Sequence, residues 1–397
     1  MNLSGKCVVL GVTGSIAAYK MADVASQLRK DGAEVHVILT KNATNFIAPQ
    51  TFETLTNQRC IVDQFDRDYK FEVTHISIAK KADLIMVAPA TANIIAKMAH
   101  GIADDMLSTV VLAARCKKIV SPAMNTAMLE NPITQDNIKT LEKYGMKIVE
   151  PASGVLACRD VGSGKLPKPE VLLEHIYFEI AHEKDLAGKK VMVTAGPTRE
   201  AMDPVRFLTN HSTGKMGYAI ARAAAMRGAE VTLIHGDTAL DSIMYTEDVH
   251  VVSAEDMFNA VEERFDETDI YISAAAVADY RPAEVADQKI KKKSDDMSLK
   301  LERTRDIIAT LGQKKTHQFI CGFAMETENL IDNAKDKLKR KNMDMIVANS
   351  LRTEGAGFGG NTNVVTIITP ERSEELPIMD KSEVADRLLD SILALGV

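Results

Sequence analysis

The chain has 397 residues, of which 46% are hydrophobic and 26% charged, and its formal net charge is −7. This length exceeds the usual size of one hydrophobic core and predicts about two domains. The composition is that of an ordinary globular protein, with no indication of a nucleic-acid partner, a membrane-spanning segment or a signal peptide. Its five scattered cysteines include no C-x-x-C pair, which favours a reducing, cytoplasmic setting.

The first half alternates between apolar segments typical of buried strands and segments with helical periodicity. We expect strands at Cys7–Gly11, Glu34–Leu39, Ala82–Ala88, Lys117–Ser121 and Lys147–Val149, and helices at Ile16–Lys30 and Met106–Ala114. This order predicts an α/β, Rossmann-like fold, in which a mostly parallel doubly wound sheet carries helices on both faces.

The second half repeats that order from a new Gly-Lys start at Gly188. We expect its strands at Lys190–Thr194, Glu230–Ile234, His250–Val252, Ile270–Ala274, Gln318–Phe323, Asp344–Asn349 and Asn363–Ile368. The increasingly polar segment 177–190 precedes this start, so two Rossmann-like domains are expected at 1–187 and 188–397. Residues 290–298 have no apolar period and are expected to form a loop.

The first candidate site begins at the glycine turn after the first strand. The segment from Gly11 to Ala17 lacks the G-x-G-x-x-G pattern of dinucleotide-binding domains. A Gly-Ser turn at a helix start can still bind one phosphate through backbone N–H groups and the Ser15 hydroxyl, so a mononucleotide such as FMN fits better than NAD. A plain turn of a doubly wound fold is the alternative. Two further polar motifs, at 89–93 and 122–128, also follow predicted strands.

Together with His75 and the glycine-rich segment 154–166, these motifs resemble the flavin-dependent cysteine decarboxylases, in particular the decarboxylase part of the bifunctional coenzyme A biosynthesis family. The resemblance implies that FMN oxidises the thiol-bearing carbon and so provides an electron sink for the loss of CO2. It implies that His75 is a base, that Asn125 holds the substrate carboxylate, and that Cys158 donates a proton. The implied flavin site consists of Gly14, Ser15, Thr40, Ala90, Thr91 and Met124.

The second glycine turn is longer than the first, since 40 positions separate Gly188 from Gly228 and only 27 separate Gly5 from Gly32. The surplus contains Ser-Thr-Gly-Lys at 212–215, which predicts a phosphate-binding helix start although the Walker A spacing is absent. A lysine cluster lies downstream at 289–292, a pattern that a solvated surface would also show.

These second-half motifs, with AAVADYRP at 275–282, resemble the phosphopantothenate–cysteine ligase part of the same family. The resemblance implies that CTP activates 4′-phosphopantothenate as an acyl cytidylate, which cysteine then attacks, while Mg2+ and lysines neutralise the phosphates. It implies that Lys289 and Asn210 act in this reaction and that Asp279 binds CTP and the metal. The remaining substrate- and CTP-binding residues that it implies are Arg206, Lys215, Ser273, Ala275, Ala276, Asp306, Ile307, Phe323, Lys337 and Lys341.

Leu129, Arg159 and Arg305 depart from the family's pattern, so the flap and one nucleotide-contacting turn are expected to differ in detail. The resemblance further implies small-molecule substrates and a homo-oligomer, in which trimeric decarboxylase units are joined through ligase dimers into a dodecamer. Two alternative functions are less consistent with the sequence. A non-catalytic flavin-binding regulatory protein is disfavoured by the presence of His75, Asn125 and Cys158, and a nicotinamide dehydrogenase by the missing dinucleotide fingerprint.

Overall fold

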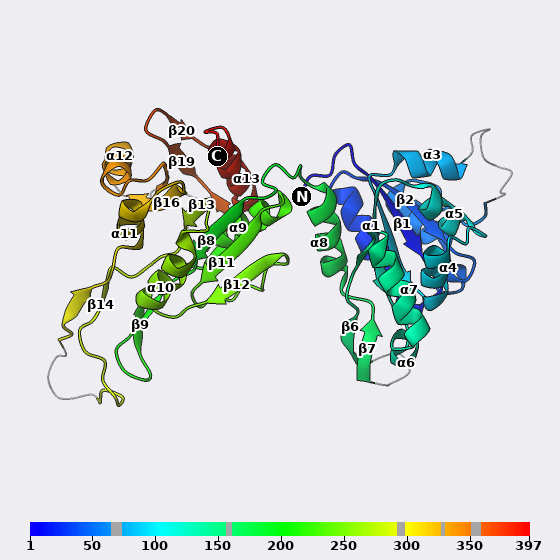
Figure 1. The fold of residues 1–397 in the computed structure, drawn as a ribbon, viewed down its shortest axis with the longest axis horizontal. Coiled ribbons are helices and arrows are strands. Elements are labelled where there is room, and N and C mark those ends of the chain that lie inside the picture. Colours follow the sequence, from blue (N-terminus) through cyan, green and yellow to red (C-terminus); the bar gives the residue numbers. More distant parts are fainter. Residues whose placement is uncertain (65–73, 156–160, 292–297, 327–329, 351–358) are drawn as a thin grey trace. The chain divides into compact units, whose positions relative to one another are not determined.

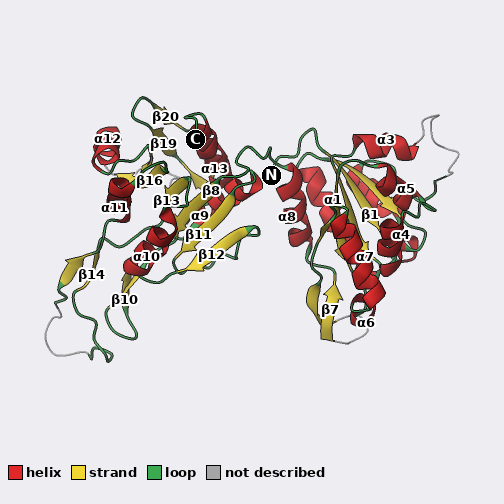
Figure 2. Ribbon diagram, viewed as in Figure 1, coloured by secondary structure: helices red, strands yellow, loops and turns green. Residues whose placement is uncertain are grey.

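The computed structural model describes residues 1–64, 74–155, 161–291, 298–326, 330–350 and 359–397. Contacts between residues divide the chain into two compact units, Met1–Glu183 and Lys184–Val397. In each unit a mostly or wholly parallel sheet lies between two layers of helices (Figure 1, Figure 2), as the sequence predicted. Within the described residues, no helix is both long and apolar enough to span a membrane.

The sheet of the first unit has the order β2-β1-β3-β4-β5, and all of its strands are parallel. These strands are β1 (Cys7–Val12), β2 (Glu34–Leu39), β3 (Leu84–Ala90), β4 (Lys117–Pro122) and β5 (Lys147–Ile148). The order reverses direction between β1 and β3, and such a switch point opens a crevice at the carboxyl ends of the strands. A hairpin, β6 (Ala152–Val155) and β7 (Val161–Lys165), follows the sheet.

Helices cover both faces of this sheet. One face packs against α3 (Thr74–Lys81), α4 (Ala92–His100), α5 (Met106–Ala113) and α7 (Pro132–Lys143). The other carries α1 (Lys20–Lys30), α2 (Pro49–Thr56) and α8 (Pro169–Ile180). A 3-10 turn, η1 (Ile16–Tyr19), precedes α1, and the short α6 (Thr126–Leu129) follows β4. The layer formed by α3, α4, α5 and α7 covers the fully buried side chains of Val9, Ile85 and Val87. This core holds β1 and β3 in place and so fixes where these strands end.

The second unit has an eight-stranded sheet with the order β12-β11-β8-β13-β16-β17-β19-β20. Its parallel strands are β8 (Lys190–Ala195), β11 (Glu230–His235), β12 (Thr246–His250), β13 (Ile270–Ser273), β16 (Phe319–Glu326) and β17 (Met345–Ser350). The antiparallel strands β19 (Val365–Ile368) and β20 (Ser373–Glu375) complete it. The switch point of this sheet lies between β8 and β13.

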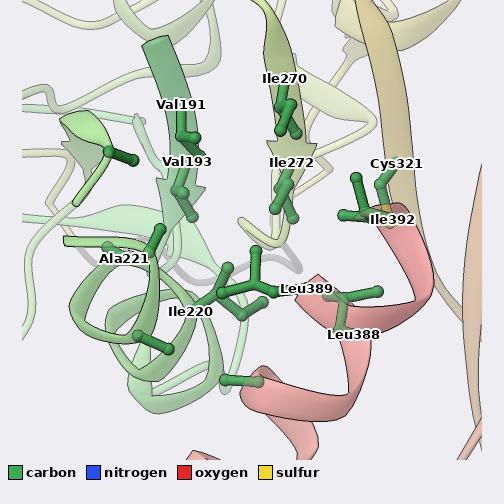
Figure 3. Packing of buried hydrophobic residues seen from close by; sticks show 14 of the residues in the cluster. Val191, Val193, Ile220, Ala221, Ile270, Ile272, Cys321, Leu388, Leu389 and Ile392 are labelled. Atoms are coloured by element: carbon green, nitrogen blue, oxygen red, sulfur yellow. The ribbon is translucent and has the colours of Figure 1, made fainter. Parts of the chain in front are cut away.

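The helices α9 (Lys215–Met226) and α13 (Lys381–Leu393) cover one face of this sheet. Figure 3 shows Ile220 of α9 and Leu389 of α13 packed against Val193 and Ile272. The opposite face is covered by α10 (Ala254–Phe265), α11 (Ile307–Lys314) and α12 (Leu330–Arg340). Burial of these apolar faces, at roughly 25 cal/mol per Å², is the main force that holds the layers together.

Short two-stranded pieces extend from the second unit. The hairpin β9 (Arg199–Ala201) and β10 (Phe207–Thr209) follows β8, and β14 (Tyr280–Pro282) pairs with β15 (Leu301–Arg303). Figure 1 shows β9 and β14 projecting on the same side of the sheet. A third pair, β18 (Thr362–Asn363) and β21 (Met379–Asp380), lies next to the start of α13.

Two expectations differ from the structure. The strand expected at His250–Val252 is β12, which ends at His250, because Val251 leads instead into Ser253, the N-cap residue of α10. The edge strand β12 is largely exposed, so it lacks the apolar pattern that would have located it. The helix expected from Ile16 begins as the 3-10 turn η1 and becomes α-helical at Lys20.

A buried arginine joins three segments of the second unit. Arg227, which is 5% exposed, ends α9. Its Nε and one terminal nitrogen donate to the two carboxylate oxygens of Asp185 at 2.8 and 2.5 Å, and its other terminal nitrogen donates to Asp390 of α13 at 2.7 Å. These hydrogen bonds, two of which form a bidentate pair with Asp185, fix the segment around Asp185 against α9 and α13.

We therefore predict that Arg227→Met lowers the free energy of unfolding by about 2 kcal/mol, because charge-assisted hydrogen bonds to a buried arginine are lost. Denaturation by urea measures the change. The matched control is Arg264→Met, since the ion pairs of Arg264, with Glu247 and Glu263, lie at the exposed surface, which predicts a loss below about 0.5 kcal/mol. Equal losses in the two variants would contradict the proposed role of Arg227.

Candidate active sites

The first candidate site lies at the carboxyl ends of β1 and β3, where one threonine ties two loops together. The Thr13 hydroxyl donates to the Pro89 carbonyl at 2.6 Å and accepts from the Thr91 backbone N–H at 3.1 Å. Thr91 is the N-cap residue of α4, and Ala90 is the last, buried residue of β3. This network places Ala90 and Thr91 beside the glycine turn of the first strand.

The turn itself is tight. A Cβ atom on Gly14 would lie 2.7 Å from the Cβ atom of Asn42, so only glycine fits there. The next residue, Ser15, caps η1 by accepting a hydrogen bond from Ala17 N–H at 3.3 Å. The turn therefore leads directly from the carboxyl end of β1 into a helix start, the kind of position at which a phosphate can bind.

Two hydroxyl groups at this edge are buried without a hydrogen-bond partner in the described part of the chain. They are the Oγ1 atom of Thr40, directly after β2, and the Oγ atom of Ser121, near the end of β4. Buried polar atoms are normally hydrogen-bonded, so each of these hydroxyls is suited to bind a ligand group. Thr40 was expected in the flavin site, whereas Ser121 was not, because a serine inside an apolar strand is an ordinary core residue.

Asn125 and Met124 lie under the hairpin β6–β7. The Asn125 side chain caps α6 by accepting from Ala127 N–H at 2.9 Å, and Met124 N–H donates to the Gly164 carbonyl at 3.0 Å. A Cβ atom on Gly164, whose φ is +130°, would lie 2.2 Å from the Met124 carbonyl oxygen. The glycine thus allows β7 to lie directly on the Met-Asn turn. The expected proton donor, Cys158, and Arg159 lie outside the described residues.

His75 is at the other edge of the first unit. It lies in the first turn of α3, and the segment after α3 meets the amino end of β1, where Asp83 N–H donates to the Cys7 carbonyl at 2.9 Å. Figure 1 shows α3 at one end of this unit and α6 with β7 at the opposite end. Within one copy of the chain, the helix that carries His75 and the turn that carries Asn125 therefore lie at different ends of the unit.

The second unit has two adjoining pockets at the carboxyl ends of β13 and β16. The larger, of about 540 Å³, is lined by Ser273, Arg303, Arg305, Asp306, Ile307 and Lys341, among others. The smaller, of about 400 Å³, is lined by Asn210, Lys215, Ala276, Lys337, Asn349 and Lys381, among others. Ala275, Val277, Asp279 and Phe323 line both pockets. A ligand that fills both would pass Asp279 at the junction.

A backbone bridge between two loops lies beside the smaller pocket, since it includes Ala276, which lines that pocket. Ala276 N–H donates to the Gly196 carbonyl at 2.9 Å, and Thr198 N–H donates to the Ala276 carbonyl at 3.3 Å. The Asn210 side-chain amide donates to the same Ala276 carbonyl at 3.0 Å, which brings the end of the β9–β10 hairpin to the site.

Eleven of the residues expected to bind acyl substrate or CTP line the pockets, whereas Arg206 and Lys289 line neither. Arg206 pairs instead with the buried Asp203 at 3.1 Å and also donates to the Ile290 carbonyl. Asp203 accepts from Ile290 N–H at 3.1 Å, so this turn holds the exposed segment that carries Lys289. Lys337 lines the smaller pocket, whereas Lys341 lines the larger one.

Charge differs between the pockets. In the larger one Lys341 pairs with Asp306 at 2.8 Å, and Asp306 also caps α11. The smaller pocket has three lysines, Lys215, Lys337 and Lys381, against the single carboxylate of Asp279. Burial and the nearby Lys215 lower the pKa of Lys381. Among the described residues, no group of three or more acidic, histidine or cysteine side chains could hold a metal ion.

Sequence reasoning missed Asn349, Asn363 and Lys381, which also line the smaller pocket. Asn349 ends a strand that the sequence predicted. A polar residue at the end of a predicted strand was the signal that located the other site residues, so Asn349 could have been found in the same way. Lys381 gave no such signal, because a lysine at a helix start is usually exposed, whereas this one is 7% exposed.

Comparison with known proteins agrees with this division of the chain. The flavoprotein family matches residues 1–180, and the family described as the DNA/pantothenate metabolism flavoprotein C-terminal domain matches residues 186–395. The coenzyme A biosynthesis bifunctional protein CoaBC of Bacillus subtilis (strain 168) is 47% identical over 99% of this chain and 98% of its own length. The chain belongs to the family of bifunctional coenzyme A biosynthesis proteins.

Two further members of this family match all or half of the chain. The CoaBC protein of Escherichia coli (strain K12) is 40% identical over 99% of this chain and 98% of its own length. A crystal structure of the C-terminal domain of a CoaBC protein is 46% identical and covers 53% of this chain and 98% of that one, with a TM-score of 0.46. The match of the flavoprotein family to residues 1–180 identifies the first half as a flavoprotein unit, and a flavin is its cofactor.

We predict that Thr40→Val leaves the stability of the flavin-free protein unchanged or slightly higher, since the hydroxyl has no partner in the described structure. Flavin affinity should fall about 5-fold, because one hydrogen bond is worth about 1 kcal/mol. Flavin fluorescence titration and thermal unfolding measure the two effects. As a contrast, Thr13→Val should lower the free energy of unfolding, since the Thr13 hydroxyl, in the loop after β1, bonds Pro89 and Thr91 of the loop after β3. Unchanged flavin affinity in Thr40→Val would exclude this hydroxyl from the flavin site.

Proposed function

We propose that this bifunctional enzyme of coenzyme A biosynthesis first ligates cysteine to 4′-phosphopantothenate at the expense of CTP, and then decarboxylates 4′-phosphopantothenoylcysteine to 4′-phosphopantetheine with FMN. The observation that carries the proposal is that a flavoprotein unit and a unit with two joined pockets occur in one chain of this family. The ligase reaction belongs to the second unit and the decarboxylation to the first, with the boundary near residues 187 and 188.

The joined pockets suit an acyl cytidylate. The carboxylate of 4′-phosphopantothenate attacks the α-phosphorus of CTP, the bond to the β-phosphate breaks, and pyrophosphate leaves. We place the nucleotide in the larger pocket with Arg303, Arg305 and Lys341, and the acyl chain in the smaller one. The anhydride then lies at the junction beside Asp279, where cysteine attacks the acyl carbon and expels CMP.

We assign Mg2+ to Asp279, with the phosphates of CTP as its other ligands. A single carboxylate is sufficient because Mg2+ commonly keeps water and phosphate oxygens as ligands. Lys289 lies on the exposed segment next to Ile290, which the Asp203 turn holds. We propose that Lys289 acts on the phosphate charge from this segment, and that Arg206 and Asn210 handle the activated acid.

In the first unit, the free hydroxyl of Thr40 and the tight Gly14-Ser15 turn fit FMN, with Ala90, Thr91 and Met124 as further contacts. When bound, the flavin supplies the redox chemistry that makes loss of CO2 feasible. Asn125 holds the substrate carboxylate under the β6–β7 hairpin, and Cys158 donates the proton that completes the reaction. A thiol can donate at neutral pH because its ordinary pKa is about 8.5.

The position of His75 supports a homo-oligomer. Because α3 lies at the edge of the first unit opposite Asn125, His75 can act as the base only in the site of a neighbouring copy. We therefore propose that decarboxylase sites form between copies of the chain. The family resemblance, and not the position of His75, is the reason for proposing trimers joined by ligase dimers into a dodecamer. A cytoplasmic location remains part of the proposal. The alternative of a non-catalytic flavin-binding protein leaves the two joined pockets of the second unit without a role.

The proposed function is tested by supplying the purified protein with 4′-phosphopantothenate, cysteine, CTP and Mg2+ and following pyrophosphate and CO2 separately. Pyrophosphate should depend on 4′-phosphopantothenate and CTP, and CO2 should depend on cysteine and bound flavin as well. Release of neither product would refute the proposal, and release of pyrophosphate alone would refute only the decarboxylase half.

Cys158→Ser should leave pyrophosphate release within about 2-fold of the parent rate and reduce 4′-phosphopantetheine formation more than 100-fold, because the serine hydroxyl is a far weaker proton donor. Mass spectrometry of the products measures the change. The control is Cys116→Ser, a half-buried cysteine outside the proposed site, which should form product normally. Normal product formation by Cys158→Ser would remove this residue from the mechanism.

Lys289→Gln should reduce pyrophosphate release about 100-fold, since one charge that stabilises the phosphates is lost. Decarboxylation of added 4′-phosphopantothenoylcysteine should be unaffected. Lys300→Gln removes another exposed lysine nearby and serves as the control. If Lys289→Gln also lost decarboxylation, the two sites would not be independent.

A further inference from the structure

The turn of the β9–β10 hairpin is organised around one buried carboxylate. The side chain of Asp203 is fully buried, although its neighbours Pro204 and Val205 are exposed. Its Oδ1 atom accepts hydrogen bonds from the backbone N–H groups of Val205 and Arg206, both at 2.8 Å. An aspartate often caps its own turn in this way, and one oxygen is enough for that task. The cap therefore does not account for the second oxygen of Asp203.

The second oxygen reaches a segment that is distant in sequence. The Oδ2 atom of Asp203 accepts from the Ile290 N–H at 3.1 Å and pairs with Nε of Arg206 at 3.1 Å. Arg206 also donates to the Ile290 carbonyl, so the turn binds both backbone polar groups of Ile290. The Met202 carbonyl accepts from the Ala286 N–H at 3.0 Å. The turn thus holds residues 286–290 at both ends.

The link depends on the ionised form of Asp203. Burial acts to raise its pKa, but the backbone hydrogen bonds from Ile290, Val205 and Arg206 outweigh this effect and lower the pKa. At neutral pH the group is therefore a carboxylate, which only accepts hydrogen bonds. A buried carboxylate is unfavourable unless its hydrogen bonds are made, so this geometry is tolerated only while the 286–290 segment stays in place.

The same hairpin is anchored at the pockets by its other end. The Thr209 hydroxyl of β10 donates to the Thr198 carbonyl at 2.8 Å, and the following residue, Asn210, donates to the Ala276 carbonyl at 3.0 Å. Asn210 and Ala276 line the smaller pocket. The hairpin therefore connects the pocket wall to the 286–290 segment, in which Lys289 is exposed and lies between the two tie points.

We propose that Asp203 is a positioning residue of the ligase reaction, which holds the 286–290 segment so that the Lys289 ammonium acts on the phosphates of the reacting nucleotide. This inference rests on the role proposed above for Lys289. A group that stabilises developing charge must be held in place, and a displacement of about 1 Å can reduce a rate about 100-fold. In this role Asp203 acts through Lys289 and not on the substrate itself.

Asp203→Asn separates the two tasks of the carboxylate. The amide oxygen can still cap the turn, whereas an NH2 group in place of Oδ2 cannot accept from the Ile290 N–H. Pyrophosphate release is measured at saturating 4′-phosphopantothenate, cysteine, CTP and Mg2+. We expect kcat to fall about 10- to 100-fold, while KM for CTP stays within about 3-fold, because the lost interaction acts in the transition state.

A double variant distinguishes positioning from a general structural effect. If Asp203 acts through Lys289, adding Asp203→Asn to Lys289→Gln should slow pyrophosphate release less than about 2-fold further, since both changes remove the same contribution. Independent effects would multiply. Decarboxylation of added 4′-phosphopantothenoylcysteine should stay within about 2-fold of the parent rate in each variant.

The matched control is Asp344→Asn. The Oδ2 atom of Asp344 likewise accepts a backbone hydrogen bond, from the Ile320 N–H at 2.7 Å, but Asp344 lines neither pocket. Its loss should lower the free energy of unfolding without changing the rate of pyrophosphate release. Thermal unfolding shows whether Asp203→Asn folds. If it does not, Asp203→Ser replaces it in the same assays, since a serine hydroxyl can cap the turn but is too short to hold Ile290 as well.

Hydrogen exchange tests the link in the parent protein without any substitution. The Ile290 amide should exchange at least about 10-fold more slowly than the same amide in an unfolded chain, because Asp203 accepts its N–H. In Asp203→Asn this protection should be lost.

Four results would overturn the inference. They are a parent rate in Asp203→Asn, losses that multiply in the double variant, an equal loss in Asp344→Asn, and an unprotected Ile290 amide in the parent protein. A parent rate in Lys289→Gln would instead refute the role assigned to Lys289, and absence of pyrophosphate release from the parent protein would refute the ligase function, so these failures are distinguishable.

Discussion

In both units, the site depends on a hydrogen-bonded tie between the two loops that leave the central pair of parallel strands. In the first unit the tie is a side chain, since the Thr13 hydroxyl bonds both Pro89 and Thr91. In the second it is backbone, since Gly196 and Thr198 bond Ala276 on both of its polar groups. Loops at a switch point diverge to opposite faces of the sheet, so without such a tie the crevice between them would have no fixed width.

The two units use the same framework for different chemistry. The first has a short turn whose Gly14 leaves no space for a side chain, so it can present only a few backbone N–H groups to one phosphate. The second inserts the β9–β10 hairpin between the strand and the helix, and this insertion brings Asn210 to Ala276. The residues that follow this hairpin, Asn210 and 212–217, line the smaller of the two adjoining pockets, whereas later segments of the chain line the larger one.

The units also differ in how complete they are within one chain. Eleven expected ligase residues line the pockets of a single copy, whereas His75 and Asn125 lie at opposite edges of the first unit. The physical cause is the direction of the chain. Residues that follow a parallel strand gather at the carboxyl edge, whereas α3, which carries His75, leads into the amino edge of the sheet, where Asp83 meets Cys7.

The sequence by itself determined the two α/β units, most of the strands and the polar residues that follow them, because buried parallel strands are continuous apolar runs and their carboxyl ends share one edge. It misplaced the exposed strand β12, because a strand that buries few side chains lacks the apolar pattern by which strands are recognised. Only the tertiary structure decided that Lys381 joins Lys215 and that Lys337 and Lys341 line different pockets. Those relations depend on how helices distant in sequence pack on a common sheet, and local periodicity contains no information about which helix ends meet.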